Sequence, residues 1–357
     1  MLLNQFIKRN RKNIILFLLE AYRLDGALIS DLSNIRYLSG FKGENALLLL
    51  TREDKILFTD ARYYIEAKRT IPKSIKLVIY QRDMIQEISL YIKILKIKNL
   101  GVEETSITYN KIKRLILDCK KIKIKDISDV ILSIRSIKRE DEIKKVKKAL
   151  SIAEKSFSEL EIKPGMRENE ISALLEYLMK KNGAEDISFP TIVASGENSA
   201  LPHYFPSNRR VKKNDVVLID FGAVYEGYHS DTTRVVFTGK VKEKIREMYN
   251  TVKSAHLYAV EILKKIREGN LLDFKVDEYL KSKGFKDGLI HSIGHGVGLN
   301  IHEFPILNRN KEFILEEGMI FTIEPGIYIE GVGGIRLENM YYIDKKNNII
   351  NLNKLKF

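Results

Sequence analysis

The stretch that decides the fold of the second half of the chain is DVVLIDFGAVYEGYHSDTTRVVF, residues 215–237. The apolar run from Asp215 to Asp220 predicts a strand, and the following Tyr225-Glu-Gly predicts a turn. Tyr228–Phe237 is again rich in β-branched and aromatic residues, as a returning strand would be. The stretch therefore predicts a β-hairpin.

The same order of elements occurs again about a hundred residues later, in MIFTIEPGIYIEGVGGIRLENMYYI, residues 319–343. Helical patterns precede both hairpins, at 168–181 and at 242–281. We therefore expect a C-terminal α+β domain made of two pseudo-symmetric halves, each a helix plus a hairpin, that face each other across one shared site.

The first third of the chain predicts a separate α/β domain of about 125 residues. Five short β-rich runs alternate there with two helical patterns: strands at 26–30, 46–50, 55–59, 75–80 and 122–124, and helices at 60–69 and 108–120. No glycine-rich loop of the dinucleotide or P-loop type occurs in it.

A long helical pattern opens at Arg139-Glu-Asp-Glu142, where acidic residues suit a helix N-terminus. The domain boundary is therefore expected within residues 127–138, and it divides the 357-residue chain into 1–130 and 131–357.

Composition narrows the range of partners. The net charge of +14 suggests nucleic acid, but much of it comes from Lys scattered among Ile and Leu, as at 93–98 and 120–125. Such Lys normally forms a solvated face, and no basic segment is interleaved with aromatics as in a base-stacking surface. We therefore expect neither nucleic acid nor membrane as a partner.

Two further features predict a cytoplasmic location. Cys119 is the only cysteine, which excludes an intrachain disulfide and fits a reducing compartment. The apolar run Ile14–Leu19 is too short to span a bilayer, which needs about 20 residues, and it is better interpreted as an amphipathic helix.

Each predicted hairpin carries two carboxylates in apolar surroundings: Asp220 and Asp231 in the first, Glu324 and Glu338 in the second. Asp is disfavoured in strands, and a buried carboxylate without a partner costs several kcal/mol or becomes protonated. Ion pairs with Arg234 and Arg336 could explain single members of this set. Four in matching positions indicate a shared cation.

Histidine supplies a fifth candidate ligand. Three of the six histidines fall in His291-Ser-Ile-Gly-His295-Gly-Val-Gly-Leu-Asn-Ile-His302, where glycines flank His295 and permit close backbone approach. Four carboxylates and one imidazole suit two divalent ions about 3.5–4 Å apart. Mn²⁺ is our first choice, and Zn²⁺, Co²⁺ or Fe²⁺ also fit such a ligand set. A water bridging the two ions would be deprotonated near neutral pH and could attack a carbonyl.

Other polar residues occur near these ligands in sequence. His203 lies in a loop between Pro202 and Tyr204, and by itself a surface role is the simpler interpretation. Arg336 lies two residues before Glu338 and could orient that carboxylate or bind substrate.

Three segments together resemble the pita-bread metallopeptidases, the group of methionine aminopeptidase, Xaa-Pro aminopeptidase (aminopeptidase P) and Xaa-Pro dipeptidase (prolidase). They are Asp220–Arg234, Gly294–Glu303 and Thr322–Asn339, which include all five candidate ligands. Ser33–Phe41 and Phe58–Tyr63 look like the N-terminal domain of the creatinase-like, proline-specific branch, which methionine aminopeptidases generally lack. The resemblance therefore implies cleavage of a bond to proline.

The resemblance also implies roles. Asp220, Asp231 and Glu338 would hold one ion, and Asp231, His295, Glu324 and Glu338 the other. Glu324 would take a proton from the nucleophilic water, His302 would stabilise the tetrahedral intermediate, and His203 and His291 would contact substrate near its proline. Arg336 would support the site through hydrogen bonds. Family members are commonly dimers or tetramers, so a homodimer is expected.

The resemblance leaves several functions open. Xaa-Pro aminopeptidase is the preferred one, because no obvious insertion would cap the carboxylate of a dipeptide. Xaa-Pro dipeptidase is the alternative. A non-enzymatic binding module is less favoured because no ligand is missing, and a metal-free creatinase-like amidinohydrolase is disfavoured for the same reason.

Overall fold

The computed structural model describes residues 14–357. The chain forms two compact units, one ending at Ile134 and one from Arg135 to Phe357. Helix α7 (Ser128–Ser136) crosses that boundary. Each unit has its own hydrophobic clusters. In the described part of the chain, no helix is both long and apolar enough to cross a membrane.

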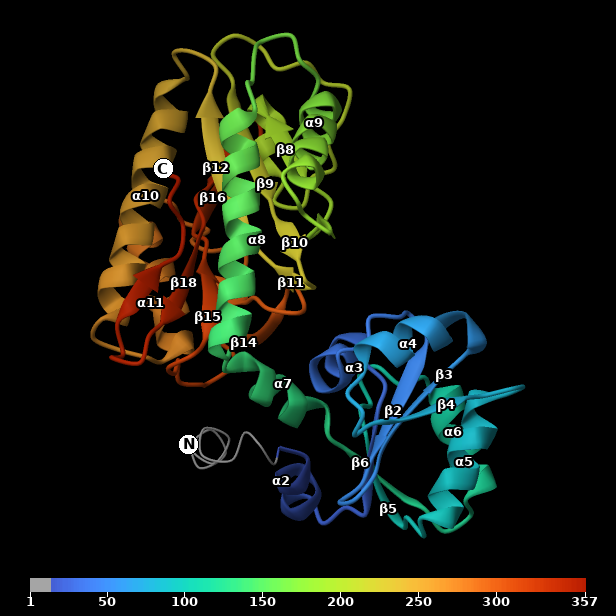
Figure 1. Ribbon diagram of the computed structural model, residues 1–357. Helices are drawn as coiled ribbons and strands as arrows, with labels where there is room; N and C mark the ends of the chain where they lie inside the picture. Colours follow the sequence, from blue (N-terminus) through green and yellow to red (C-terminus); the bar gives the residue numbers. More distant parts are fainter. Residues whose placement is uncertain (1–13) are drawn as a thin grey trace. The chain divides into compact units, whose positions relative to one another are not determined.

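The first unit is built on a mixed six-stranded sheet (Figure 1). Its strand order is β4-β3-β2-β1-β5-β6, with β1 parallel to β5 and antiparallel to β2. The strands are β1 Gly26–Ile29, β2 Ala46–Leu50, β3 Lys55–Thr59, β4 Lys76–Ile79, β5 Asn99–Val102 and β6 Lys123–Asp126. Hydrophobic runs such as Ala46–Leu50 are buried throughout, because helices cover both faces.

The two faces have separate cores. Leu48 and Leu50 pack with the helices α2, α3, α4 and α7, whereas Leu47 and Leu49 pack with α5 and α6. These helices are α2 Ile14–Ala21, α3 Leu32–Ser39, α4 Tyr64–Thr70, α5 Met84–Ile94 and α6 Tyr109–Asp118. The predicted α/β class is correct, but β5 and the helices α3, α5 and α7 were not predicted.

The second unit contains the duplicated element. In its first half, β9 (Val216–Phe221) pairs with β12 (Thr232–Phe237), and β10 (Ala223–Tyr225) pairs with β11 (Tyr228–His229). In its second half, β15 (Ile320–Ile323) pairs with β18 (Asn339–Ile343), and β16 (Gly326–Ile329) pairs with β17 (Gly333–Arg336). The two predicted hairpins therefore exist, and each is broken into an outer and an inner pair.

The remaining strands extend these sheets. They are β7 Asp186–Ile187, β8 Ile192–Ser195, β13 Gly294–Gly296, β14 Glu303–Leu307 and β19 Ile349–Asn351. β8 lies beside β9, whereas β13, β14 and β19 join β15 and β18 in one five-stranded sheet.

Two helices pack mainly on each half (Figure 1). α8 (Glu140–Glu159) and α9 (Glu168–Lys181) pack on β8 and β9, and α10 (Glu243–Leu263) and α11 (Gly269–Ser282) pack on β15 and β17. The helix predicted over 242–281 is thus two helices, separated by Lys264–Glu268.

The breaks in the hairpins explain where carboxylates are tolerated. Asp231 lies between β11 and β12, Glu324 between β15 and β16, and Glu338 between β17 and β18. The placing of Asp231 and Glu338 inside continuous return strands was therefore wrong. At a break the backbone leaves the ladder, so a carboxylate there does not oppose strand propensity.

Gly222 joins β9 to β10 in the tightest place of the first hairpin. A Cβ at this residue would lie 1.9 Å from the carbonyl oxygen of Ser230, next to Asp231. We expect Gly222→Ala to lower the free energy of unfolding by about 3 kcal/mol, the upper end of overpacking. Gly183→Ala is the control, because it has positive φ but no atom within 4 Å, and backbone strain alone costs about 1 kcal/mol. Equal losses in urea unfolding would contradict the steric argument.

Candidate metal centre

One cavity of about 450 Å³ lies between the two hairpin halves. All nine residues singled out from the sequence line it: His203, Asp220, Asp231, His291, His295, His302, Glu324, Arg336 and Glu338. The elements that supply them are β9, β13, β17, the hairpin breaks and three loops. Phe189, Pro190, Ile192, Phe205 and Ile306 complete an otherwise apolar wall.

The carboxylates are buried without enough protein partners. Asp231 and Glu338 are 4% and 1% exposed. One buried oxygen on each of Asp220, Asp231 and Glu338 accepts no hydrogen bond from the protein. An orphaned buried acceptor is costly, so three in one cavity fit a site for a cation.

Electrostatics leads to the same conclusion. Burial, and then the charges of Asp220 and Glu324, raise the pKa of Asp231 well above its ordinary value. Burial followed by the charge of Asp231 raises the pKa of Glu338 in the same way. These carboxylates repel one another across a low-dielectric space, and a divalent cation would remove that repulsion.

His295 presents a free nitrogen to this cluster. Its Nδ1 lies 3.1 Å from the carbonyl oxygen of Gly296, which can only accept, so Nδ1 carries the proton. Its Nε2 lies 3.4 Å from Oδ2 of Asp231 and 3.5 Å from Oε1 of Glu324. Ligand atoms of Asp231, His295 and Glu338 all lie within 4.8 Å of one another. This is the arrangement of an imidazole ligand held in one tautomer by its second nitrogen.

Arg336 is the cation that the protein itself brings to the cluster. Its Nη2 donates to Oδ2 of Asp220 at 2.6 Å, and its Nε donates to Thr233 Oγ1, which in turn donates to Glu338 Oε2. Although burial opposes it, the nearby Tyr328 and Asp220 raise the pKa of Arg336, so the guanidinium stays charged. Arg336 thus orients two carboxylates but neutralises only one.

Tyr328 joins Arg336 to His291. The hydroxyl oxygen accepts from Nη1 of Arg336 at 2.7 Å and lies 3.0 Å from Nε2 of His291. Burial raises the pKa of Tyr328 to about 12, so it remains a neutral donor. Because Nδ1 of His291 faces the carbonyl oxygen of Ser292 and donates to it, Nε2 accepts a hydrogen bond from the Tyr328 hydroxyl.

Several supporting groups were not predicted from the sequence. Glu303, next to His302, is buried with Arg135 and Lys138, which both donate to it. Asp273 and Asp277 on α11 accept from the backbone amides of Ile293 and Leu289, on either side of His291. No local pattern distinguishes such carboxylates from surface ones, because their partners are distant in sequence.

The last described residues also support the site. Asn353 bonds to Thr232 and to the backbone of Met340, and Arg234 donates both to the carbonyl of Glu338 and to that of Leu355. The C-terminal segment therefore braces both strand breaks that hold Asp231 and Glu338.

His256 has a structural role away from the cavity. It is buried, and its ring nitrogens contact the carbonyl of Leu337 and the hydroxyl of Tyr341.

Comparison with known proteins matches each unit to a protein family. Residues 144–345 match the model of metallopeptidase family M24, and residues 13–137 match the creatinase/prolidase N-terminal domain. The chain is 39% identical over 323 residues to an Xaa-Pro dipeptidase of Pyrococcus furiosus, covering 90% of this chain and 91% of that protein.

Solved structures are similar over nearly the full length. An Xaa-Pro dipeptidase from Bacillus anthracis is 35% identical with a TM-score of 0.91, and the match covers 97% of this chain and 98% of that one. An X-Pro aminopeptidase from Thermotoga maritima is 37% identical with a TM-score of 0.87, covering 95% and 98%. This chain belongs to the metallopeptidases of family M24, with an N-terminal domain of the creatinase and prolidase type.

Proposed function

We propose that this protein is an Xaa-Pro dipeptidase that depends on two divalent metal ions. The observation that carries the metal site is the set of three buried carboxylate oxygens without protein partners around His295. The substrate class is supported by relatives named Xaa-Pro dipeptidase at 39% and 38% identity. This choice reverses the order of the two activities that the sequence alone favoured.

The proposed metal ligands are Asp220, Asp231, His295, Glu324 and Glu338. Ligand atoms of Asp231, His295 and Glu338 lie within 4.8 Å of one another, and Asp231 and Glu338 would each contribute to holding both ions. Oxygen-rich ligation with one imidazole suits Mn²⁺ first, with Zn²⁺, Co²⁺ or Fe²⁺ as alternatives.

The ions, when bound, would supply a nucleophile at neutral pH and a Lewis acid for the scissile carbonyl. Glu324 is placed to receive a proton, since its Oε1 accepts only a 3.2 Å bond from Thr322 and faces Nε2 of His295. His302, whose ring centroid is 4.3 Å from that of His295, would donate to the developing oxyanion. His203 and His291 would contact the substrate beside its proline. Arg336 would keep Asp220 oriented.

Xaa-Pro aminopeptidase is the second candidate, and one observation favours it. The residues that line the cavity include no Lys, and their single Arg, Arg336, is 3% exposed and paired with Asp220. The free carboxylate of a dipeptide would therefore have to be recognised by an imidazole such as that of His203, because both ring nitrogens of His291 are already engaged by Ser292 and Tyr328. A longer peptide, in which that carboxyl group is an amide, makes no such demand.

The ligand assignment predicts that metal changes the thermal stability of Glu338→Gln and of the wild type differently. Glu338→Gln removes a buried charge, so we expect the metal-free variant to melt at a higher temperature than the metal-free wild type. Mn²⁺ at 100 times its Kd should stabilise the wild type by about 2.7 kcal/mol but the variant much less. Differential scanning calorimetry and elemental analysis measure both effects. Glu330→Gln is the control, because Glu330 is exposed in a turn. Wild-type metal stoichiometry in Glu338→Gln would contradict the assignment.

The substrate assignment predicts a difference between peptides of different length. Purified protein with Mn²⁺ should hydrolyse Ala-Pro with a higher kcat/KM than Ala-Pro-Ala, and chelation should abolish both activities. Ala-Ala controls for contaminating dipeptidases. A higher kcat/KM for the tripeptide would favour the aminopeptidase instead, and no metal-dependent cleavage of either proline peptide would reject both.

A further inference from the structure

The loop between β8 and Val211 forms one wall of the cavity. It contains the 3-10 turn Gly196–Ala200, and it brings Pro202, His203 and Phe205 to the cavity wall. The side chain of His203 has no hydrogen bond to any described residue, and it is exposed to solvent. Its position over the carboxylate cluster is therefore set by the loop backbone.

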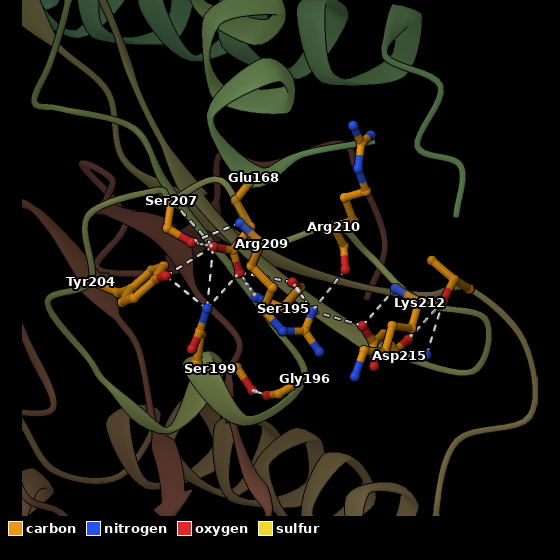
Figure 2. A network of polar contacts seen from close by, with 12 residues as sticks. Glu168, Ser195, Gly196, Ser199, Tyr204, Ser207, Arg209, Arg210, Lys212 and Asp215 are labelled. Atoms are coloured by element: carbon orange, nitrogen blue, oxygen red, sulfur yellow. Dashed lines mark hydrogen bonds and ion pairs between the residues drawn. The ribbon is translucent and has the colours of Figure 1, made fainter. Parts of the chain in front are cut away.

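A single buried carboxylate, that of Glu168, organises this loop (Figure 2). Glu168 is the first residue of α9 and is fully buried. Six donor groups reach it from the last residue of β8 and three loop residues: the backbone and hydroxyl of Ser195, the amide of Asn198, the hydroxyl of Tyr204, and the backbone and hydroxyl of Ser207. These contacts bracket His203 on both sides in sequence.

The charge of Glu168 is retained despite its burial. Burial alone would raise the pKa of Glu168, but the bonds from Ser195 and Ser207 outweigh it and lower that pKa. The carboxylate also sits in the first turn of α9, where the helix dipole favours a negative charge. Since every neighbour donates, a carboxylate fits here and an amide of the same shape does not.

The loop is tied further on the same side by Arg209, which donates to the hydroxyl of Ser195 and to Asp215. Gly196 makes room for that guanidinium, because a Cβ there would lie 2.3 Å from it. The backbone amides of Glu168 and Asn169 donate to the carbonyls of Arg209 and Ser207. The N-terminus of α9 and the loop thus form one polar unit, visible in Figure 2.

On its other side the loop touches the second hairpin half. Ser199 Oγ accepts from the backbone amide of Gly334 at 2.8 Å, and Arg336 Nη1 lies 3.4 Å from the carbonyl of Pro202. The loop therefore spans from the N-terminus of α9 to the strand that carries Arg336, with His203 between its two attachments.

We infer that Glu168 is a positioning residue, which holds this loop so that His203 reaches the substrate. The identity of the substrate rests on the proposed function. The attachment of the loop to Glu168 does not. Glu168 touches neither the cavity nor the metal ligands, so its effect on substrate has to pass through the loop.

The attachment of the loop to Glu168 is tested on the full-length, metal-loaded protein by hydrogen exchange. In Glu168→Gln we expect faster amide exchange across residues 196–207 and unchanged exchange in β9 and β15. Glu170→Gln is the matched control, because Glu170 is exposed on the same helical turn and bonds only the Arg167 backbone and side chain. Unchanged exchange of the loop in Glu168→Gln would overturn the inference, whether or not the protein cleaves Xaa-Pro peptides.

The link to His203 is tested by a double-mutant cycle on kcat/KM for Ala-Pro. We expect Glu168→Gln and His203→Ala each to lower kcat/KM by about 10- to 100-fold, mainly through KM, with metal content unchanged. Because the two residues act in series, the double variant should be no worse than His203→Ala alone. Multiplying losses would show that Glu168 acts independently of His203 and would overturn the inference.

A milder variant keeps the test decisive if Glu168→Gln does not fold. Ser207→Ala removes one donor to Glu168 and leaves its charge in place, so it should produce a smaller change in the same direction in both measurements. If wild-type protein cleaves no Xaa-Pro peptide, the proposed function fails, and hydrogen exchange still decides whether Glu168 holds the loop.

Discussion

Mutual repulsion among buried carboxylates is the constraint on which the second unit depends. Asp231 and Glu338 come from opposite halves of the duplicated element, yet both are almost fully buried and their ligand atoms lie within 4.8 Å of each other. Among the residues that line the cavity, Arg336 carries the one guanidinium, and it pairs with Asp220. The fold therefore brings together negative charges that its own side chains do not balance. A bound cation would relieve the repulsion between carboxylates that come from the two halves.

The sequence was informative wherever the pattern was local. Alternating apolar runs predicted both hairpins, and carboxylates in apolar surroundings together with the glycine-flanked His295 predicted the residues that the structure gathers around one cavity. The breaks within the return strands were not predicted, because β-branched or aromatic residues on both sides of Asp231 and Glu338 suggested unbroken strands. Composition cannot reveal where a strand leaves its ladder to turn a carboxylate inward.

The supporting carboxylates escaped prediction for a different reason. Glu168 and Glu303 look like ordinary acidic residues, and their roles arise from donors that lie about 30 to 170 positions away in the chain. Neither belongs to the metal cluster, and each is buried under a loop that lines the cavity. Groups of this kind become visible only when the fold is known, although Glu168 bonds the loop that carries His203 and Glu303 directly follows His302.

The bracing of the strand breaks by Asn353 and Leu355 has a consequence for how the protein is made. Domains generally fold as units in the order of synthesis, so the first unit can complete its sheet while the second is still being translated. The cavity cannot follow at once, because Thr232, Met340 and Arg234 obtain their last hydrogen bonds only from residues beyond 351. The full set of hydrogen bonds around the pocket is therefore complete only after the chain has been made as far as Leu355.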